Sequence, residues 1–525
     1  MKEYFVVVTE PQYKEQIHQE LLAAHGVSPI PDRPVICQDD MPFSEYNGIF
    51  LLTDEEAEAL KSDPRVSDVH LSYQEMGGGI KHCGIRTGQY DKRSSTTAVT
   101  NTMKNWGLAR CISAIENFGT GVQIANTYTY NLNGGGVDII LIDSGVDAGH
   151  PEFAVNADGT GGSRVIDYDW TQLGAITAVP RGGFLGDCEG HGSNCASIAA
   201  GNTNGWAPGA NIYSLRTVGT GAVFPNTEHD ITTGAVLGLV DDHQAWQSVR
   251  LFHQNKSVDP ATGYKRPTIV SASYQYYSIY NNIQSITYRG VTHAVTTTTG
   301  VGATNYGTIG LPDGASGNHG LRYSAIEADI SSAIAAGVVV VSAAGNDAHK
   351  IDISTGLDYN NYWTDTGNVI RYYHRGGTPG AADGVICVGA LSDVLPEHKI
   401  SYSDTGPRVD VFSPGNLIMG AYSSAANIFA SIPDPRNGSY YLNKVSGTSQ
   451  ATPQVTGICA LLLQLRPWMT PADVRSWITG TAARNLLSET YYGQTGTYTN
   501  FASLQGAVNG ILYMPYNLPT PLTIS

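Results

Sequence analysis

Ser449 stands in a sequence pattern that could make a serine nucleophilic. It lies in the string Ser-Gly-Thr-Ser-Gln-Ala-Thr-Pro at residues 446–453, and a long apolar run follows. The pattern predicts a tight turn at the glycine and a serine in the first turn of a buried helix, where backbone N–H groups are unpaired and the helix dipole is positive. Such surroundings stabilise the negative oxygen that forms when a hydroxyl attacks a carbonyl. Taken alone, the string also fits an ordinary helix cap.

An aspartate and a histidine upstream supply the two other groups that this chemistry requires. Asp143 closes the apolar run 137–142, which predicts the C-terminal end of a central parallel strand. His191 stands between two glycines and opens a predicted helix of small residues. Imidazole can take the proton of a serine hydroxyl near neutral pH, and a carboxylate on its second nitrogen fixes the tautomer. Asp143, His191 and Ser449 therefore predict an acyl-transfer triad.

The three strings resemble the signature motifs of the subtilase (subtilisin-like) serine peptidases, in content and in the chain order Asp, His, Ser. Further segments resemble family motifs in the same order, at residues 206–210, 338–346 and 409–415. The resemblance covers residues 105–480. It implies an α/β fold of three layers around a central, mostly parallel sheet, with the triad at one edge of that sheet.

The resemblance also implies the residues around the triad. Asn346 and the backbone N–H of Ser449 are the expected oxyanion hole. The segments expected to bind the substrate contribute six residues, namely Ser273, Tyr274, Gln275, Ala343, Ala344 and Gly345. The family prefers glycines where this chain has Gln275 and Tyr276, so we expect these two side chains to narrow the cleft, and the substrate preference stays open.

A histidine and several cysteines near the motifs are not expected to react. His150 matches a turn histidine of the family pattern, and we interpret it as structural. Cys195 lies one helical turn after His191, as in the thiol-bearing branch of the family, and is expected to be a buried free thiol. The seven cysteines are an odd, scattered set that gives no clear disulfide framework. Cys387 and Cys459 lie in apolar segments and are expected to be inert core residues.

The first 80 residues differ from the rest of the chain in charge. They carry 5 basic and 15 acidic residues, a net charge of −10, whereas the whole chain has −16. Alternating apolar segments predict a strand at 4–8, a helix at 11–25, a strand at 48–52, a helix from 53 to 61 and a strand at 66–72. This order suggests a small α+β module of the ferredoxin-like kind.

The predicted organisation has four parts. Residues 1–76 resemble a subtilase propeptide that inhibits and assists folding, with an independent binding module as the alternative. Residues 77–104 are the expected linker, with self-cleavage expected near 73–79. Residues 105–495 are the expected peptidase domain, and residues 496–525 the expected C-terminal extension.

Two stretches exceed what a minimal family member needs. Residues 256–266 form a short one. Residues 278–321 form a longer one, rich in Tyr, Thr, Gly and Asn and without clear periodicity, which is expected near the cleft rim.

Together these features predict a serine endopeptidase that works through an acyl-enzyme and is made as a self-processing zymogen. Two alternatives stay open. One is a catalytically retired subtilase fold that serves as a structural or binding subunit. The other is a sedolisin-like acid peptidase, which shares the Ser-Gly-Thr-Ser string but uses Glu and Asp where this chain has His191 and Asn346.

The expected partners are protein or peptide substrates and the chain's own propeptide. No cofactor is expected for the chemistry, and the metal ligands are unknown, although the family often binds structural calcium. The net charge of −16 argues against nucleic acid, and no apolar stretch of about 18 residues is present to span a membrane. No signal peptide is recognised, so the expected location is open between export by a non-classical route, the cell interior and a virion.

Overall fold

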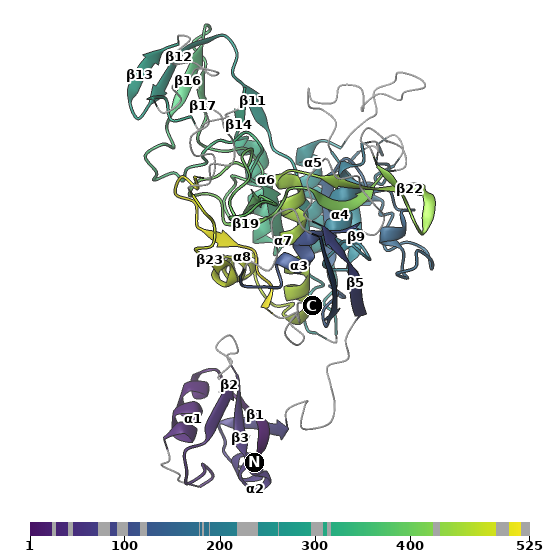
Figure 1. Cartoon of the computed structure of the whole chain (residues 1–525), viewed down its shortest axis with the longest axis vertical. Helices are drawn as coiled ribbons and strands as arrows, with labels where there is room; N and C mark the ends of the chain where they lie inside the picture. The colour runs from purple at the N-terminus through teal and green to yellow at the C-terminus, as the bar shows by residue number, and fades with distance from the viewer. Residues whose placement is uncertain are drawn as a thin grey trace. The chain divides into compact units, whose positions relative to one another are not determined.

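The computed structural model describes residues 1–23, 28–39, 46–71, 84–91, 103–115, 123–177, 179–180, 183–187, 189–217, 240–260, 262–295, 308–311, 317–423, 431–489 and 503–515. The chain divides into two compact units, Met1–His82 and Cys83–Ser525, which are described separately (Figure 1). No helix in the described ranges has the length and apolarity that a membrane crossing needs.

The N-terminal unit is a four-stranded antiparallel sheet with two helices. Its elements are β1 (Lys2–Val8), α1 (Gln12–Leu22), β2 (Ile36–Asp39), β3 (Asn47–Leu52), α2 (Asp54–Leu60) and β4 (Val66–Leu71). The strand order β2-β3-β1-β4 is that of a ferredoxin-like fold, as the sequence predicts. Thr53 and Glu56 form the predicted capping box at the start of α2. Leu21, Phe50 and Leu60 contribute to the unit's own fully buried core.

The expected linker 77–104 is not a linker throughout. It contains β5 (Gly84–Asp91) and β6 (Met103–Lys104), which join β7 (Gln123–Tyr130) in a three-stranded sheet of the second unit. The expectation is wrong for these strands because β5 pairs along its whole length with β7, a partner that lies far along the chain. The expected cleavage region 73–79 lies outside the described residues.

The second unit is built on an eight-stranded sheet. Its strands are β8 (Asp138–Asp143), β9 (Asn211–Arg216), β10 (Thr268–Ala272), β15 (Val339–Ala343), β18 (Ile386–Leu391), β19 (Val411–Pro414), β23 (Ala483–Arg484) and β24 (Gly510–Ile511). The order is β23-β24-β19-β18-β15-β10-β8-β9, and all pairs are parallel except β23 with β24. The sheet is therefore mostly parallel, as expected.

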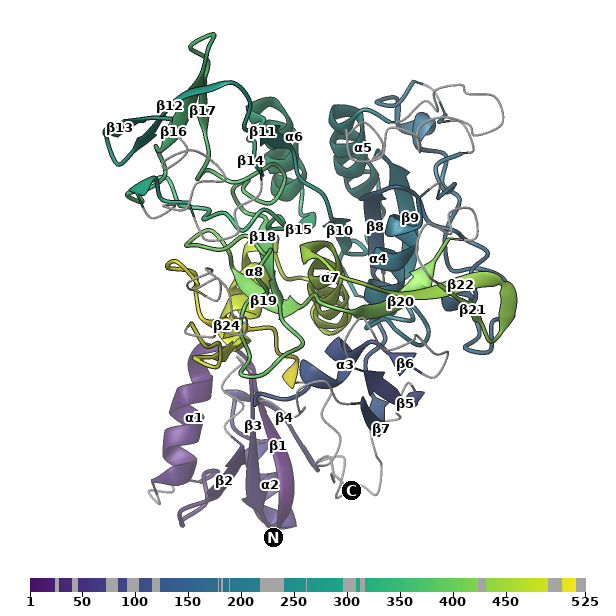
Figure 2. The ribbon, with the colours of Figure 1, turned by 45° about the horizontal axis from the view of Figure 1, so that its top comes forward.

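Helices cover both faces of this sheet (Figure 2). They are α3 (Trp106–Arg110), α4 (His191–Ala200), α5 (Asp242–Gln254), α6 (Ser324–Ala335), α7 (Thr448–Leu465) and α8 (Pro471–Thr481), with 3₁₀ turns η1 (Pro151–Phe153) and η2 (Trp170–Leu173). Alternate residues of a strand face opposite sides. Ile139 and Leu141 of β8 join the core cluster that includes α4 and α7, whereas Ile140 and Ile142 join the cluster that includes α5 and α6.

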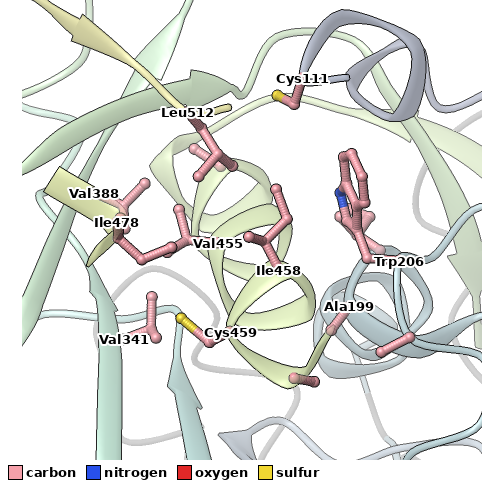
Figure 3. Packing of buried hydrophobic residues seen from close by; sticks show 14 of the residues in the cluster. Cys111, Ala199, Trp206, Val341, Val388, Val455, Ile458, Cys459, Ile478 and Leu512 are labelled. Carbon is pink, nitrogen blue, oxygen red and sulfur yellow. The ribbon is translucent and has the colours of Figure 1, made fainter. Parts of the chain in front are cut away.

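Helix α7 is the buried centre of the larger cluster. Val455, Ile458 and Cys459 are fully buried on it and pack among residues from the sheet and from other helices (Figure 3). Pro453 is the sixth residue of α7 and lies beyond its first turn, so the carbonyl oxygen of Ser449 lacks its helical N–H donor; the hydroxyl of Ser273 and the thiol of Cys195 donate to this oxygen instead. Burial of each apolar side chain of this size contributes roughly 1.5–3 kcal/mol to folding. The buried side chains therefore hold this helix in a fixed position relative to the sheet.

The long stretch 278–321 contributes to an antiparallel sheet that the sequence pattern does not reveal. Four strands form it, namely β12 (Ile283–Tyr288), β13 (Val291–Ala294), β16 (Tyr362–Asp365) and β17 (Ile370–Tyr372). A short pair, β11 (Tyr277–Ile279) and β14 (Asn318–Gly320), leads to it (Figure 1). The remaining three-stranded sheet is β20 (Ile418–Tyr422), β21 (Ile432–Asp434) and β22 (Asn437–Val445).

The expected C-terminal extension is also corrected in part. Within it, β24 joins the main sheet between β19 and the edge strand β23. Leu512 and Met514 after it are fully buried, and Met514 N–H donates to the carbonyl oxygen of Cys111. Residues 503–515 therefore belong to the second unit's core, and 516–525 lie outside the described residues.

Candidate active site

The parallel sheet brings the predicted catalytic residues to one edge. Asp143 is the last residue of β8, and Asn346 lies three residues after the end of β15. The carboxyl ends of parallel strands meet at the same edge, where α/β proteins place their ligands. His191 is the first residue of α4 and Ser449 the second of α7. These helices pack against each other (Figure 2), so their N-terminal ends bring both residues to this edge.

Asp143 and His191 are joined directly. Nδ1 of His191 donates to Oδ1 of Asp143 at 2.8 Å, and this oxygen also accepts from the backbone N–H of Ser144 at 2.7 Å. Asp143 is buried, whereas the side chain of His191 keeps 27% of its surface exposed. The carboxylate therefore holds the Nδ1 proton and leaves Nε2 as the nitrogen that can accept one.

The electrostatics favour a charged imidazole. Burial lowers the pKa of His191, but the charge of Asp143, the neighbouring Cys195 and the hydrogen bond to Asp143 together outweigh burial and raise the pKa well above 6.5. Burial raises the pKa of the Cys195 thiol, so the thiol stays protonated near pH 7. Cys195 Sγ lies 3.9 Å from His191 Nδ1 and donates to the carbonyl oxygen of Ser449 at 3.4 Å. The buried free thiol expected here is confirmed.

Asp187 fixes the start of α4 and is not among the residues predicted from the sequence. Its carboxylate accepts from the N–H groups of Glu189, Gly190 and Ser193 at 2.8–3.1 Å, and from the hydroxyl of Ser144 at 2.8 Å. Gly190 has φ of 92°, a left-handed conformation that favours glycine. The signal available in the sequence is a carboxylate shortly before a helix start, the place of an N-terminal cap.

Ser449 and Ser273 clasp each other through two hydrogen bonds. The hydroxyl of Ser449 donates to the backbone carbonyl oxygen of Ser273 at 3.0 Å. The hydroxyl of Ser273 in turn donates to the backbone carbonyl oxygen of Ser449, also at 3.0 Å. The Ser449 hydroxyl thus rests on a carbonyl here and must rotate to reach His191. Loose catalytic hydrogen bonds are common before a substrate binds.

Two hydrogen-bond donors meet beside Gly447. Oδ1 of Asn346 accepts from both the N–H and the hydroxyl of Thr448 at 2.9 Å, so these bonds fix the orientation of the amide. A Cβ built on Gly447 would lie 3.5 Å from Nδ2 of Asn346 and 3.5 Å from the N–H nitrogen of Ser449. Asn346 is exposed. A carbonyl oxygen entering this place would meet two donors at once, which is the geometry of an oxyanion hole.

Comparison with known proteins decides the family. The family model described as "Subtilase family" matches residues 134–507, well over half of the chain. The chain belongs to the subtilase family. It is therefore a hydrolase, and the family predicted from the sequence is confirmed.

Individual relatives of this subtilase are distant. An extracellular serine proteinase of Thermus sp. (strain Rt41A) is 24% identical over 434 residues, 83% of this chain and 70% of the relative. Alkaline serine exoprotease A of Vibrio alginolyticus is 24% identical over 465 residues, 88% of this chain and 57% of the relative. The crystal structure of a cold adapted subtilisin-like serine proteinase is 21% identical with a TM-score of 0.46, over 79% of this chain and 98% of that one.

The side chains that were expected to narrow the subtilase cleft point in different directions. The hydroxyls of Tyr274 and Tyr276 donate to the same oxygen of Asp242, at 3.0 and 2.8 Å. For Tyr276 the expectation is wrong, because its ring packs on Tyr323 and its hydroxyl is drawn to α5. Gln275 instead donates to Asp347, the residue that follows Asn346.

The backbone of the expected substrate segments is partly engaged within the protein. Gly345 N–H donates to the hydroxyl of Thr448 at 3.3 Å, and its carbonyl accepts from Asp404. Tyr276 is bonded through both its N–H and its carbonyl oxygen, to residues 378 and 321. Ala343 and Ala344 are buried at the end of β15. Their role in substrate binding stays a prediction.

One group of potential metal ligands converges in the described part of the subtilase. It consists of Asp143, His191 and Cys195, whose ligand atoms all lie within 4.8 Å of one another. The Asp143–His191 hydrogen bond and the protonated thiol account for this group without an ion. Calcium prefers six to eight oxygen ligands, so this nitrogen- and sulfur-containing set does not fit it. His150 is structural in its contacts, since Nδ1 accepts from Glu152 N–H and Nε2 meets a carbonyl oxygen.

Proposed function

We propose that this chain is a serine endopeptidase that hydrolyses peptide bonds through an acyl-enzyme. The observation that carries the proposal is the hydrogen-bonded pair of Asp143 and His191 at the same sheet edge as a serine that begins a buried helix. The family membership and the names of the relatives, which are proteases, support it. Protein and peptide chains are the proposed substrates.

Each group then has a defined task. The hydroxyl of Ser449 attacks the scissile carbonyl, and its proton passes to Nε2 of His191. Asp143 holds the ring through Nδ1 and stabilises the imidazolium. The developing oxyanion accepts from Nδ2 of Asn346 and from the N–H of Ser449. His191 then protonates the leaving amine, and a water molecule, deprotonated by the same nitrogen, releases the acyl group.

We further propose that the chain is a zymogen and that the N-terminal unit, Met1–His82, is its inhibitor and folding aid. The support is its ferredoxin-like fold, its own core and its position directly before the catalytic unit in the chain. A large sheet with distant pairings forms slowly, because loop closure precedes its contacts, and a folding aid would lower that barrier.

Intact-mass measurement of freshly purified protein tests both proposals. The wild type is expected to lose a fragment of the size of the N-terminal unit during incubation. Ser449→Ala, which keeps the fold but lacks the nucleophile, is expected to stay full length. Processing of the Ser449→Ala chain at the same rate would assign the cleavage to another protease and contradict self-processing.

A further inference from the structure

The segment that follows β10 sends its side chains alternately to two sides. The hydroxyl of Ser273 contacts the start of α7 at 3.0 Å. Tyr274 and Tyr276 point the other way and share the carboxylate of Asp242 at the start of α5. Because successive side chains of an extended segment point to opposite sides, Gln275 shares the side of Ser273. It therefore lies on the side where the nucleophilic serine stands.

The carboxamide of Gln275 fills the space between two glycines. Its Nε2 donates to Oδ2 of Asp347 at 2.9 Å. A Cβ built on Gly345 would lie 2.5 Å from Nε2 and 2.6 Å from Oε1, and one built on Gly377 would lie 2.8 Å from Oε1. All three distances are shorter than van der Waals contact. The amide thus occupies the room that side chains at both glycine positions would need.

The carboxyl group of Asp404 lies close to this amide. Its Oδ1 accepts from the N–H groups of Asp347 and His349 at 3.0 and 2.8 Å. Its Oδ2 approaches the same Cβ position of Gly345, and neither this oxygen nor Oε1 of Gln275 has a hydrogen-bond partner among the described residues. Burial raises the pKa of Asp404 well above 3.8, and the charge of Asp347 adds to this. A protonated Asp404 can donate to Oε1, which would hold Gln275 at both ends.

The place of Gln275 matters because of where a bound peptide must lie. With its carbonyl oxygen between Nδ2 of Asn346 and the N–H of Ser449, the residue that carries this carbonyl lies between the ends of β10 and β15. These strands are neighbours, with Ala272 opposite Ser342. The side chain of that residue, here called P1, enters the gap between the two segments that follow the strands, and Gln275 already lies in this gap.

We propose that Gln275 closes the P1 pocket, so that the enzyme cleaves after glycine, alanine or serine and rejects aromatic residues. This inference rests on the proposed peptidase function. The hydrogen bond to Asp347 and the contacts with two glycine backbones keep the amide from swinging aside. A cationic P1 side chain that displaced Gln275 to reach Asp347 is the competing arrangement.

The test compares peptide p-nitroanilides that differ only at P1, with Ala, Phe or Lys. Rates are divided by the concentration of sites that a fluorophosphonate titrates, so that poorly folded protein does not count. The wild type is expected to prefer Ala over Phe at least about tenfold in kcat/KM, within the range that pocket size achieves. Gln275→Ala is expected to raise the value for Phe at least about tenfold and to leave that for Ala nearly unchanged.

Two further variants separate size from other effects. Gln275→Met keeps the bulk without the amide and is expected to keep the preference for Ala. Gln254→Ala changes an exposed glutamine on α5 and is expected to change nothing.

Three results overturn the proposal, and they can be told apart. If the wild type cleaves after Phe as fast as after Ala, the closed P1 pocket is refuted while the peptidase function stands. A preference for Lys also refutes the closed pocket alone, and it would assign Asp347 to cation binding. A protein that neither hydrolyses any of the three peptides nor reacts with the fluorophosphonate removes the peptidase function itself, and the pocket with it.

Discussion

Asn346 and Thr448, 102 positions apart in the sequence, are joined by two hydrogen bonds of 2.9 Å that both end on Oδ1 of Asn346. The loop after β15 is thereby tied to the first residue of α7. With its oxygen occupied in this way, the amide presents Nδ2 toward the place beside the Ser449 N–H where an oxyanion would form.

Asn346→Ala is expected to lower kcat by about 10²–10³ and to change KM little, because the lost donor acts mainly on the transition state. The substitution also leaves the N–H of Thr448 without its acceptor, at a cost of about 1–3 kcal/mol in the free energy of unfolding. Kinetics per titrated site, with denaturant unfolding beside them, separate the two effects. Thr448→Val, which keeps the Asn346 amide but loses one bond to it, should show a smaller loss of kcat. Full turnover in Asn346→Ala would remove this residue from the mechanism.

Gly447→Ala tests the proposed oxyanion hole by placing a methyl group in it. The new Cβ would lie 3.5 Å from both donor nitrogens and 2.9 Å from Oε1 of Gln450. Because Gly447 has φ of 161°, extended backbone that any residue can adopt, no backbone strain follows. We expect a stable protein whose kcat falls at least about tenfold, less than the loss of a whole donor. Normal turnover together with normal stability would show that the oxyanion forms elsewhere.

The pH dependence follows from the Asp143–His191 pair. The general base must be neutral, and the pKa of His191 is raised well above 6.5. We therefore expect kcat/KM to rise with pH through a midpoint above 6.5. The free energy of unfolding depends on pH in the opposite direction. A raised histidine pKa stabilises the folded state below pH 6.5, and this contribution is lost as the pH rises through the folded-state pKa.

Asp143→Asn removes the charge that raises this pKa. The variant should show a lower midpoint and a greatly reduced maximal rate, since the tautomer is no longer held. An optimum near pH 4 in the wild type would instead favour the acid-peptidase alternative.

Asp187→Ala is expected to destabilise the protein and to disturb His191 together. It removes the acceptor of three backbone N–H groups and one hydroxyl, and each unpaired buried donor costs about 1–3 kcal/mol. The loss in unfolding free energy should therefore exceed the about 1 kcal/mol of an average substitution. Asp169→Ala is the control, because this exposed carboxylate caps only η2. Equal stability of the two variants would contradict the anchoring role of Asp187.

The sequence predicted those elements that local patterns specify. The strand that ends at Asp143 is a short apolar run, and α2 begins at a capping box formed by Thr53 and Glu56, two residues that interact within one turn. The motifs of the site are equally local, so the paired Asp143 and His191 could be anticipated.

The missed features depend on partners that lie far apart in the chain. Strand β12 lies beside β16, where Ser285 meets Thr364 across 79 positions, and neither strand alternates apolar and polar residues clearly. Strand β5 cannot be recognised in the predicted linker because its partner β7 follows only after an intervening helix. The direction of Tyr276 was misjudged for the same reason, since Asp242, which attracts its hydroxyl, lies 34 positions earlier.

Labelling with a fluorophosphonate, followed by peptide mass spectrometry, shows directly whether Ser449 is the nucleophile. We expect one probe molecule per chain, attached to Ser449, with no labelling of Ser449→Ala and much slower labelling of His191→Ala. Modification of a different serine, or equal labelling of wild type and Ser449→Ala, would show that Ser449 is not the nucleophile.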